Sequence, residues 1–148
     1  MGSGIRALLV VAAAVRGAAA SDVRVDVTEP APGNPKVTTD HSYDAHVTLW
    51  IEGENGERTA SGWSTRPEDN GNGRPFTFQP GKNLIRGWSL GVVKMREGER
   101  ALIHVPPELG YGTSPQGREG GAWYIPGNSN LLFDIEILGK ANAGKRDL

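Results

Sequence analysis

Short stretches of the chain alternate apolar and polar residues, which is the pattern of β-strands that bury one face. The clearest stretches are residues 22–28, 45–51, 100–105 and 131–138. In the last stretch every second side chain is apolar: Leu131, Phe133, Ile135 and Ile137. Because successive side chains of a strand point to opposite faces, this spacing predicts one face turned into a core. Glycine, proline and asparagine between the stretches, as at Asn55-Gly56, predict tight turns.

The middle of the chain shows a different pattern, a short strand followed by a short helix. Phe76 and Phe78 flank Thr77, so a strand here turns both rings to one face. After a turn-forming Pro-Gly-Lys-Asn sequence, apolar side chains recur at the spacing of one helical face: Leu84, Trp88, Val92 and Met95. Gly98 is typical of a residue that ends a helix. A helix this short is marginal alone, so we expect it to pack on the strand, with Trp88 as the floor of a hollow and the phenylalanines as its wall.

Two stretches follow neither period. Residues 62–74 and 110–130 are rich in glycine, proline and asparagine, and we expect turns in the first and a long loop in the second. Several short strands and one short helix predict an α+β fold, in which an antiparallel sheet carries one helix across it.

Composition narrows the picture to one small domain. The chain has 148 residues and a hydrophobic content of 37%, enough for a single core. Its 16 basic and 17 acidic residues give a net charge of −1 with no basic block, so we expect no nucleic-acid partner. The absence of cysteine excludes disulfides and thiolate catalysis. His41, His46 and His104 supply no closed ligand set, and we expect neither a metal nor a cofactor.

Both ends of the chain resemble targeting signals. Residues 1–20 hold a basic residue, an apolar run and three alanines before Ser21, as in a cleaved signal peptide, although the first four residues also resemble a cloning leader. The run is too short to span a membrane. The tail, residues 140–148, ends in Lys145-Arg146-Asp147-Leu148, which resembles a KDEL-type retention signal. We therefore expect the secretory pathway and the lumen of the endoplasmic reticulum, or the cytoplasm if the N-terminus is an artefact.

Four spaced motifs carry a family resemblance: PFTF, GKNLIRGWSLGVVKM, REGERALIHVPPELGYG and IPGNSNLLFDIEIL. In this order they resemble the FKBP-type peptidyl-prolyl cis-trans isomerases, the immunophilins that bind tacrolimus and rapamycin. The resemblance covers about residues 22–139 as one domain. It implies a twisted antiparallel β-sheet wrapped around one short α-helix, and acceleration of X-Pro isomerisation during protein folding. Proline-containing polypeptides and such macrolides are the implied partners, and we expect a monomer. The signal-like termini further resemble the luminal members of the family.

The resemblance also implies which residues form the prolyl pocket. Trp88 would be its indole floor, and Tyr111 and the Ile85 backbone N–H would donate hydrogen bonds to a ligand carbonyl. The other implied contacts are Phe76, Phe78, Phe133, Leu84, Leu49, Trp50, Trp63, Trp123, Tyr124 and Ile125. Rotating an X-Pro amide requires only the loss of its resonance, so this chemistry needs no nucleophile, metal or proton shuttle.

Three positions leave alternatives open. The tyrosine that the family has on its second strand aligns with Leu49 by strand parity or with Trp50 by ring type. Trp123 lies on a glycine-rich loop and is either a lid over the pocket or a packing anchor for that loop. Gly62 and Trp63 stand where the family has phenylalanine and aspartate. This last departure favours, as an alternative, a catalytically weak or inactive module that binds proline peptides or acts as a chaperone.

Overall fold

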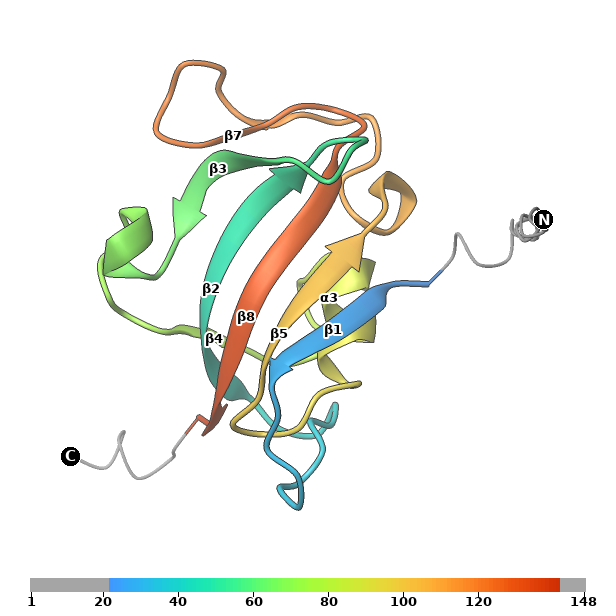
Figure 1. Cartoon of the computed structure of the whole chain (residues 1–148), viewed down its shortest axis with the longest axis vertical. Helices are drawn as coiled ribbons and strands as arrows, with labels where there is room; N and C mark the ends of the chain where they lie inside the picture. The colour runs from blue at the N-terminus through green and yellow to red at the C-terminus, as the bar shows by residue number, and fades with distance from the viewer. Residues whose placement is uncertain (1–21, 142–148) are drawn as a thin grey trace, which may run out of the picture.

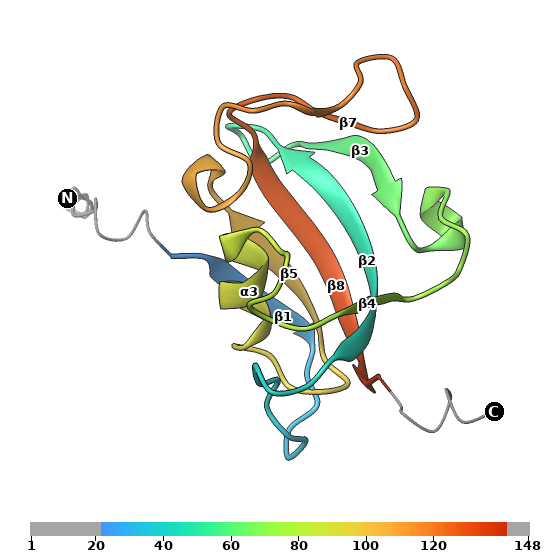
Figure 2. The same cartoon turned by 180° about the vertical axis from the view of Figure 1, so that it is seen from behind.

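A computed structural model describes residues 22–141 as a twisted antiparallel sheet with a helix across one face (Figures 1 and 2). The strand order is β1-β5-β8-β2-β3, and β4 pairs with one end of β2. The strands are β1 (Arg24–Glu29), β2 (Tyr43–Glu52), β3 (Arg58–Ser64), β4 (Phe76–Phe78), β5 (Arg100–Val105) and β8 (Asn130–Lys140). The helix is α3 (Arg86–Val92), and two 3-10 turns are η2 (Pro67–Asp69) and η3 (Pro107–Leu109). The predicted α+β architecture is confirmed.

The core lies between α3 and the sheet. β8 pairs with β2 on one side and with β5 on the other, so these three strands direct their inward side chains to one place. The buried inward residues of the three strands are Tyr43, Ala45, Val47, Leu49, Ala101, Ile103, Val105, Leu131, Phe133, Ile135 and Ile137. The alternation in residues 131–138 therefore correctly predicted which face of this strand lies in the core.

Two glycines allow α3 to lie close to β5. Gly87 and Gly91 are buried, and a Cβ atom on either would clash with the side chain of Val105 or Ile103. Trp88 follows the first of these glycines, so the close approach fixes the depth of its indole over the sheet.

The helix is shorter than its apolar pattern suggested. Asn83 has a φ of 56° and Ile85 is extended, so α3 begins only at Arg86. Leu84 therefore precedes the helix. Met95 follows the helix, and the Met95 side chain is fully buried. The apolar spacing correctly marked residues that pack in or against the core. It overestimated the length of the helix, because the residues at both ends of the pattern lie in turns.

The prediction of turns throughout residues 62–74 is wrong at its start, because β3 runs to Ser64. Thr48 pairs with Ser64 and Trp50 pairs with Ala60, so β3 has four residue steps where β2 has two. The two extra residues form a bulge, in which Gly62 has a φ of 93°. A bulged edge strand carries no regular alternation, which explains why the pattern failed here.

Two other expectations need correction. The long loop predicted at residues 110–130 contains a hairpin of β6 (Gln116–Gly117) and β7 (Tyr124–Ile125). The first strand is shifted to Arg24–Glu29, and Val27 is 42% exposed because β1 is an end strand of the sheet.

The proposed targeting signals, at residues 1–20 and 145–148, lie outside the described residues. Between residues 22 and 141, no helix has the length and apolar character needed to cross a membrane.

Candidate functional site

An apolar cleft opens beside α3, the bulge of β3 and the β6–β7 hairpin, and its volume is about 270 Å³. Its lining residues are Leu49, Trp63, Phe76, Asn83, Leu84, Ile85, Trp88, Tyr111, Trp123, Ile125 and Phe133. None of these side chains is a carboxylate or a cation. An apolar group can therefore leave water here without an unpaired charge being buried with it.

Trp88 is the floor of this cleft. Its side chain comes from α3, it is 6% exposed, and aromatic rings surround it. The ring centroids of Phe133 and Phe76 lie 5.0 and 5.5 Å from that of the indole, both in edge-to-face arrangements. Its Nε1 is buried without a hydrogen-bond partner in the described part of the chain. Because packing against several rings fixes the indole, the floor has one defined orientation.

The bulge of β3 directs Trp63 into the wall of the cleft. The Trp63 ring contacts Phe76 and Trp88 edge to face, with centroid distances of 5.7 and 6.5 Å. At Gly62, a Cβ atom would clash with the Ala122 carbonyl oxygen and lie 2.9 Å from the Trp123 Cα. A side chain at position 62 is excluded by this packing, so the aromatic ring of this wall comes from position 63.

Two polar donors lie at the cleft. Tyr111 lines the cleft and is 38% exposed, so its hydroxyl can reach a ligand there. Partial burial raises the pKa of Tyr111 above its ordinary value of 10.0, so the phenol remains a donor at neutral pH. Ile85 caps the start of α3, and its carbonyl accepts from the Trp88 and Ser89 N–H groups. Its own N–H precedes the helical ladder and has no backbone acceptor in the described range.

The hairpin closes another side of the cleft. Ile125 on β7 is 2% exposed and Trp123, just before it, is 39% exposed. Both line the cleft, and the backbone of Trp123 also packs against Gly62 and Gly117. Trp123 therefore has features of both alternatives. Its backbone packs against the neighbouring segments, and the residue also lines the cleft.

The structure separates three expected residues from the cleft. Phe78 is 5% exposed and lies behind Trp88, with centroids 5.4 Å apart. Trp50 and Tyr124 each line a different hollow. Of the two alternatives on β2, Leu49 lines the cleft and Trp50 does not, because alternate residues of a strand face opposite sides.

Sequence reasoning missed Asn83 as a lining residue. The signal available was an asparagine in a turn before a helix, where Asn often takes a positive φ. That pattern indicates a turn but says nothing of which surface the turn borders.

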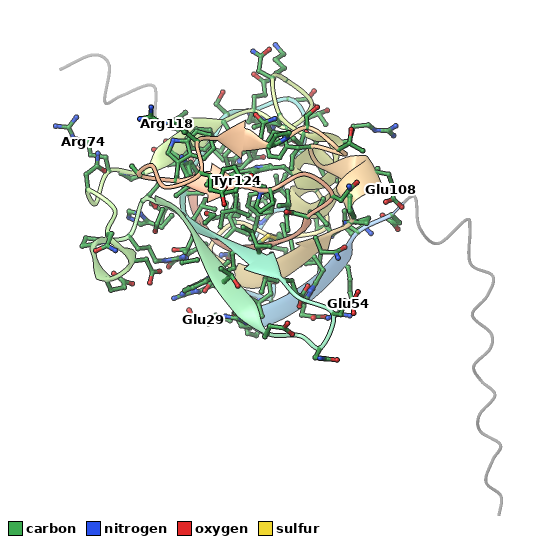
Figure 3. The ribbon with its side chains drawn as sticks, turned by 90° about the horizontal axis from the view of Figure 1, so that it is seen from above. Glu29, Glu54, Arg74, Glu108, Arg118 and Tyr124 are labelled. Atoms are coloured by element: carbon green, nitrogen blue, oxygen red, sulfur yellow. The ribbon has the colours of Figure 1, made fainter. Side chains whose placement is uncertain are left out.

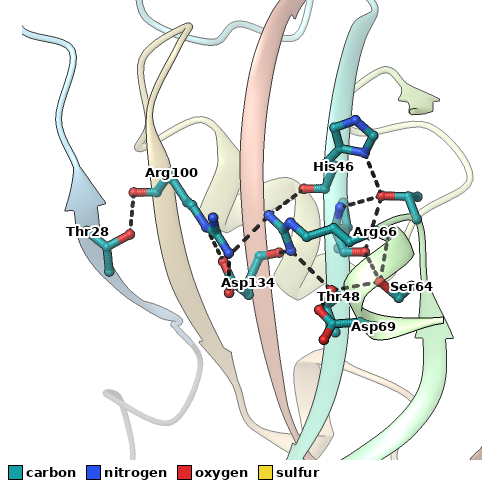
Figure 4. A network of polar contacts seen from close by, with 10 residues as sticks. Thr28, His46, Thr48, Ser64, Arg66, Asp69, Arg100 and Asp134 are labelled. Atoms are coloured by element: carbon teal, nitrogen blue, oxygen red, sulfur yellow. Dashed lines mark hydrogen bonds and ion pairs between the residues drawn. The ribbon is translucent and has the colours of Figure 1, made fainter. Parts of the chain in front are cut away.

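A buried polar network on the other face of the sheet holds the segment after the bulge (Figure 4). Arg66 is 4% exposed and donates to the Thr48 hydroxyl at 3.1 Å and to the Asp134 carbonyl oxygen at 2.9 Å. It also donates to the His46 carbonyl oxygen at 3.3 Å. Asp134 pairs with Arg100 as well, at 2.9 and 3.0 Å. These bonds tie the chain just beyond Trp63 to β2 and β8.

Comparison with known proteins identifies the family of the chain and agrees with its fold. A sequence model of the FKBP-type peptidyl-prolyl cis-trans isomerase family matches residues 33–138. The chain belongs to this family. The peptidyl-prolyl cis-trans isomerase FKBP12 of Arabidopsis thaliana is 38% identical over 111 residues, covering 72% of this chain and 89% of that protein. FKBP12 of Vicia faba is 42% identical over 108 residues, covering 70% and 86% of the two chains.

Solved FKBP structures share the architecture. The crystal structure of AtFKBP13 has a TM-score of 0.64 and 32% identity, and the match covers 82% of this chain and 94% of that one. The N-terminal domain of FKBP42 from Arabidopsis thaliana has a TM-score of 0.63 and 25% identity, over 82% and 87%. Other FKBP relatives are longer than the shared region. FK506-binding protein 2 of Dictyostelium discoideum is 44% identical over 68 residues, and the match covers 45% of this chain and 47% of that protein.

Proposed function

We propose that this chain is an active peptidyl-prolyl cis-trans isomerase that accelerates X-Pro isomerisation during protein folding. The observation that carries the proposal is the uncharged aromatic cleft over Trp88, with the Tyr111 hydroxyl and the Ile85 N–H as donors. Membership of the FKBP family and relatives named as isomerases support it.

The cleft suits this reaction for physical reasons. A planar X-Pro amide is held by resonance, with a barrier of about 20 kcal/mol and a spontaneous time of tens of seconds. The twisted amide is less polar than the planar one, so it leaves water at a lower cost. Lowering the barrier by about 4 kcal/mol would accelerate the rotation roughly a thousandfold.

The roles of individual residues follow from their positions. The proline ring would lie on Trp88, between Phe76 and Phe133, where apolar and aromatic surface surrounds it. Tyr111 and the Ile85 N–H would donate to carbonyl oxygens of the substrate and hold them while the amide turns. The remaining walls of the cleft are Leu49, Trp63, Asn83, Leu84, Trp123 and Ile125. Because Phe78, Trp50 and Tyr124 lie outside the cleft, we assign them no contact with the proline.

The alternative is a module that binds proline peptides without turnover. It was suggested by the change at positions 62 and 63, which removes the family's ring and carboxylate. The position of Trp63 favours the enzyme, because its indole borders an open cleft and replaces the missing ring. An indole that filled the cleft would favour the module.

We also propose three properties of the whole protein. Tacrolimus and rapamycin type macrolides would occupy the same cleft, since an FK506-binding protein is among the relatives. The protein would act as a monomer. The signal-like ends of the sequence support the lumen of the endoplasmic reticulum as its location.

A coupled assay on a proline tetrapeptide tests the activity. We expect turnover by the unmodified protein, and its loss in a Trp88→Leu, Tyr111→Phe double variant that still folds. Binding of the peptide by the unmodified protein without any turnover would establish the module and overturn the enzyme.

A further inference from the structure

A second hollow lies next to the cleft, between β3 and the β6–β7 hairpin, with a volume of about 300 Å³. We call it the β3 groove. Thr59 and Ala60 border it from the strand, and Ala122, Trp123 and Tyr124 border it from the hairpin. Figure 3 shows Tyr124 where the hairpin passes β3. No lining residue of the groove is charged, as in the cleft.

Trp123 connects the two hollows. It lines both the cleft and the β3 groove, and its side chain is 39% exposed. The contact of Gly62 with the backbone of residues 122 and 123 holds the hairpin against the bulge at this point. A chain that leaves the cleft across this indole therefore enters the groove directly.

The strand that borders the groove has a free edge. β3 is the last strand of its sheet, and within residues 22–141 no strand pairs with its outer side. In such a strand alternate N–H and C=O groups point outward, where they can pair with an extended chain. The groove thus combines backbone hydrogen-bonding groups with an uncharged, partly apolar surface.

We propose that the β3 groove binds the residues of the substrate that flank the proline, in an extended conformation along β3, with Trp123 as a specificity-determining contact. This inference rests on the proposed isomerase function. An extended chain advances about 3.3 Å per residue, so several residues beside the proline are needed to cross an indole and lie along the strand. The favoured substrate class is therefore a polypeptide with small, uncharged residues near its proline, because no lining residue of the groove carries a charge that could pair with a charged side chain.

The experiment compares peptides of different length around one X-Pro bond. The probes are a tetrapeptide, decapeptides extended on the N-terminal or the C-terminal side with Ala, Ser and Thr, and the same decapeptides with Glu in the extension. For each we would measure the affinity by fluorescence anisotropy and kcat/KM by the coupled assay. We expect one uncharged decapeptide to exceed the tetrapeptide by roughly fivefold to tenfold in both quantities, the gain expected for about one net hydrogen bond. We expect Glu in the extension to remove that gain.

A variant locates the effect. Thr59→Arg places a charged side chain in the groove, and we expect it to abolish the advantage of the decapeptide over the tetrapeptide. Thr28→Arg makes the same change on the other end strand of the sheet, and we expect the advantage to remain. If Thr59→Arg does not fold by circular dichroism, Trp123→Leu tests the same ratio.

The proposal is overturned if neither extension improves affinity, or if the folded variant in the groove leaves the advantage intact. A decapeptide that binds more tightly than the tetrapeptide but is not isomerised would instead contradict the proposed activity. The affinity ratio and the turnover therefore separate the two proposals.

Discussion

At the scale of single residues, the wall of the cleft takes its aromatic ring from position 63 instead of position 62. Gly62 adopts a conformation with positive φ against the backbone of the hairpin, where no side chain fits. Trp63 supplies the ring instead and packs on Phe76 and Trp88. The aromatic character of this wall is thus preserved without the phenylalanine that the family resemblance leads us to expect at position 62.

This arrangement predicts that restoring a side chain at position 62 is harmful. Gly62→Ala should lower the free energy of unfolding by about 2 kcal/mol more than Gly33→Ala, measured by urea denaturation. Gly33 is the matched control because its φ is 89°, close to the 93° of Gly62, while a Cβ atom there meets nothing within 4 Å. Equal losses in the two variants would show that packing against Ala122 is unimportant.

Tyr111 allows a second prediction. Tyr111→Phe keeps the ring and removes the donor, and we expect kcat/KM to fall roughly threefold to tenfold, because one hydrogen bond to the substrate is lost. Since burial raises the pKa of this phenol above 10.0, its ionisation would diminish activity only at a pH above that value. The pH profile of the coupled assay checks this. A decline below pH 9 that Tyr111→Phe removes would contradict it.

The raised pKa of Tyr111 also makes the stability of the protein depend on pH. The folded state retains the Tyr111 proton to a higher pH than the unfolded chain does, so the contribution of this group decreases as the pH rises past 10.0 and is constant below it.

At the scale of elements, α3 depends on glycine more for packing than for flexibility. Alanine is about 1 kcal/mol better than glycine in an isolated helix. We nevertheless expect Gly91→Ala to destabilise the protein by about 1–3 kcal/mol, because its Cβ would overlap the Ile103 side chain on β5. Thermal unfolding measures the change, with Arg86→Ala on the exposed side of α3 as the control. Stabilisation by Gly91→Ala would show that the helix can move away from the sheet freely.

The polar network behind the bulge is the second element with a testable role. Arg66→Met removes the donor to Thr48 and to the carbonyl oxygens of His46 and Asp134, and we expect a loss of about 2–4 kcal/mol in the free energy of unfolding. Asp134 itself keeps Arg100 as a partner.

Arg24→Met is the control for this variant, because the Arg24 side chain is 68% exposed and its pair with Asp26 is worth little. Chemical denaturation should therefore show a clearly larger loss in the free energy of unfolding for Arg66→Met than for Arg24→Met. A cost for Arg66→Met as small as that for Arg24→Met would mean that the network does not hold the segment after β3.

At the scale of the whole molecule, one sheet serves two purposes. Its inner face carries α3 and the cleft, and its outer face carries the network that ties the chain beyond Trp63 to β2 and β8. A ligand in the cleft contacts residues from most of the fold, so it should bind the folded state alone.

Ligand binding should therefore stabilise the molecule as a unit. Tacrolimus at a hundred times its Kd would raise the free energy of unfolding by about 2.7 kcal/mol, provided the unfolded chain does not bind it. Thermal unfolding with and without the compound checks this, and the Trp88→Leu variant should show no shift. An equal shift in that variant would place the ligand elsewhere.

The sequence alone determined the inward faces of the central strands and the aromatic floor. Leu131, Phe133, Ile135 and Ile137 share one buried face because strand periodicity is a property of neighbouring residues. The same is true of the positions of Trp88 and Phe76, which local spacing and turn residues indicate.

Only the tertiary structure decided the shape of the site. That Trp63 replaces the ring expected at position 62 depends on Ala122, about sixty residues away in the chain. The choice of Leu49 over Trp50, and the place of Trp123 between two hollows, likewise depend on which distant segments pack together. Local patterns specify which side of an element is apolar, but the partner that covers this side is fixed only when the chain folds.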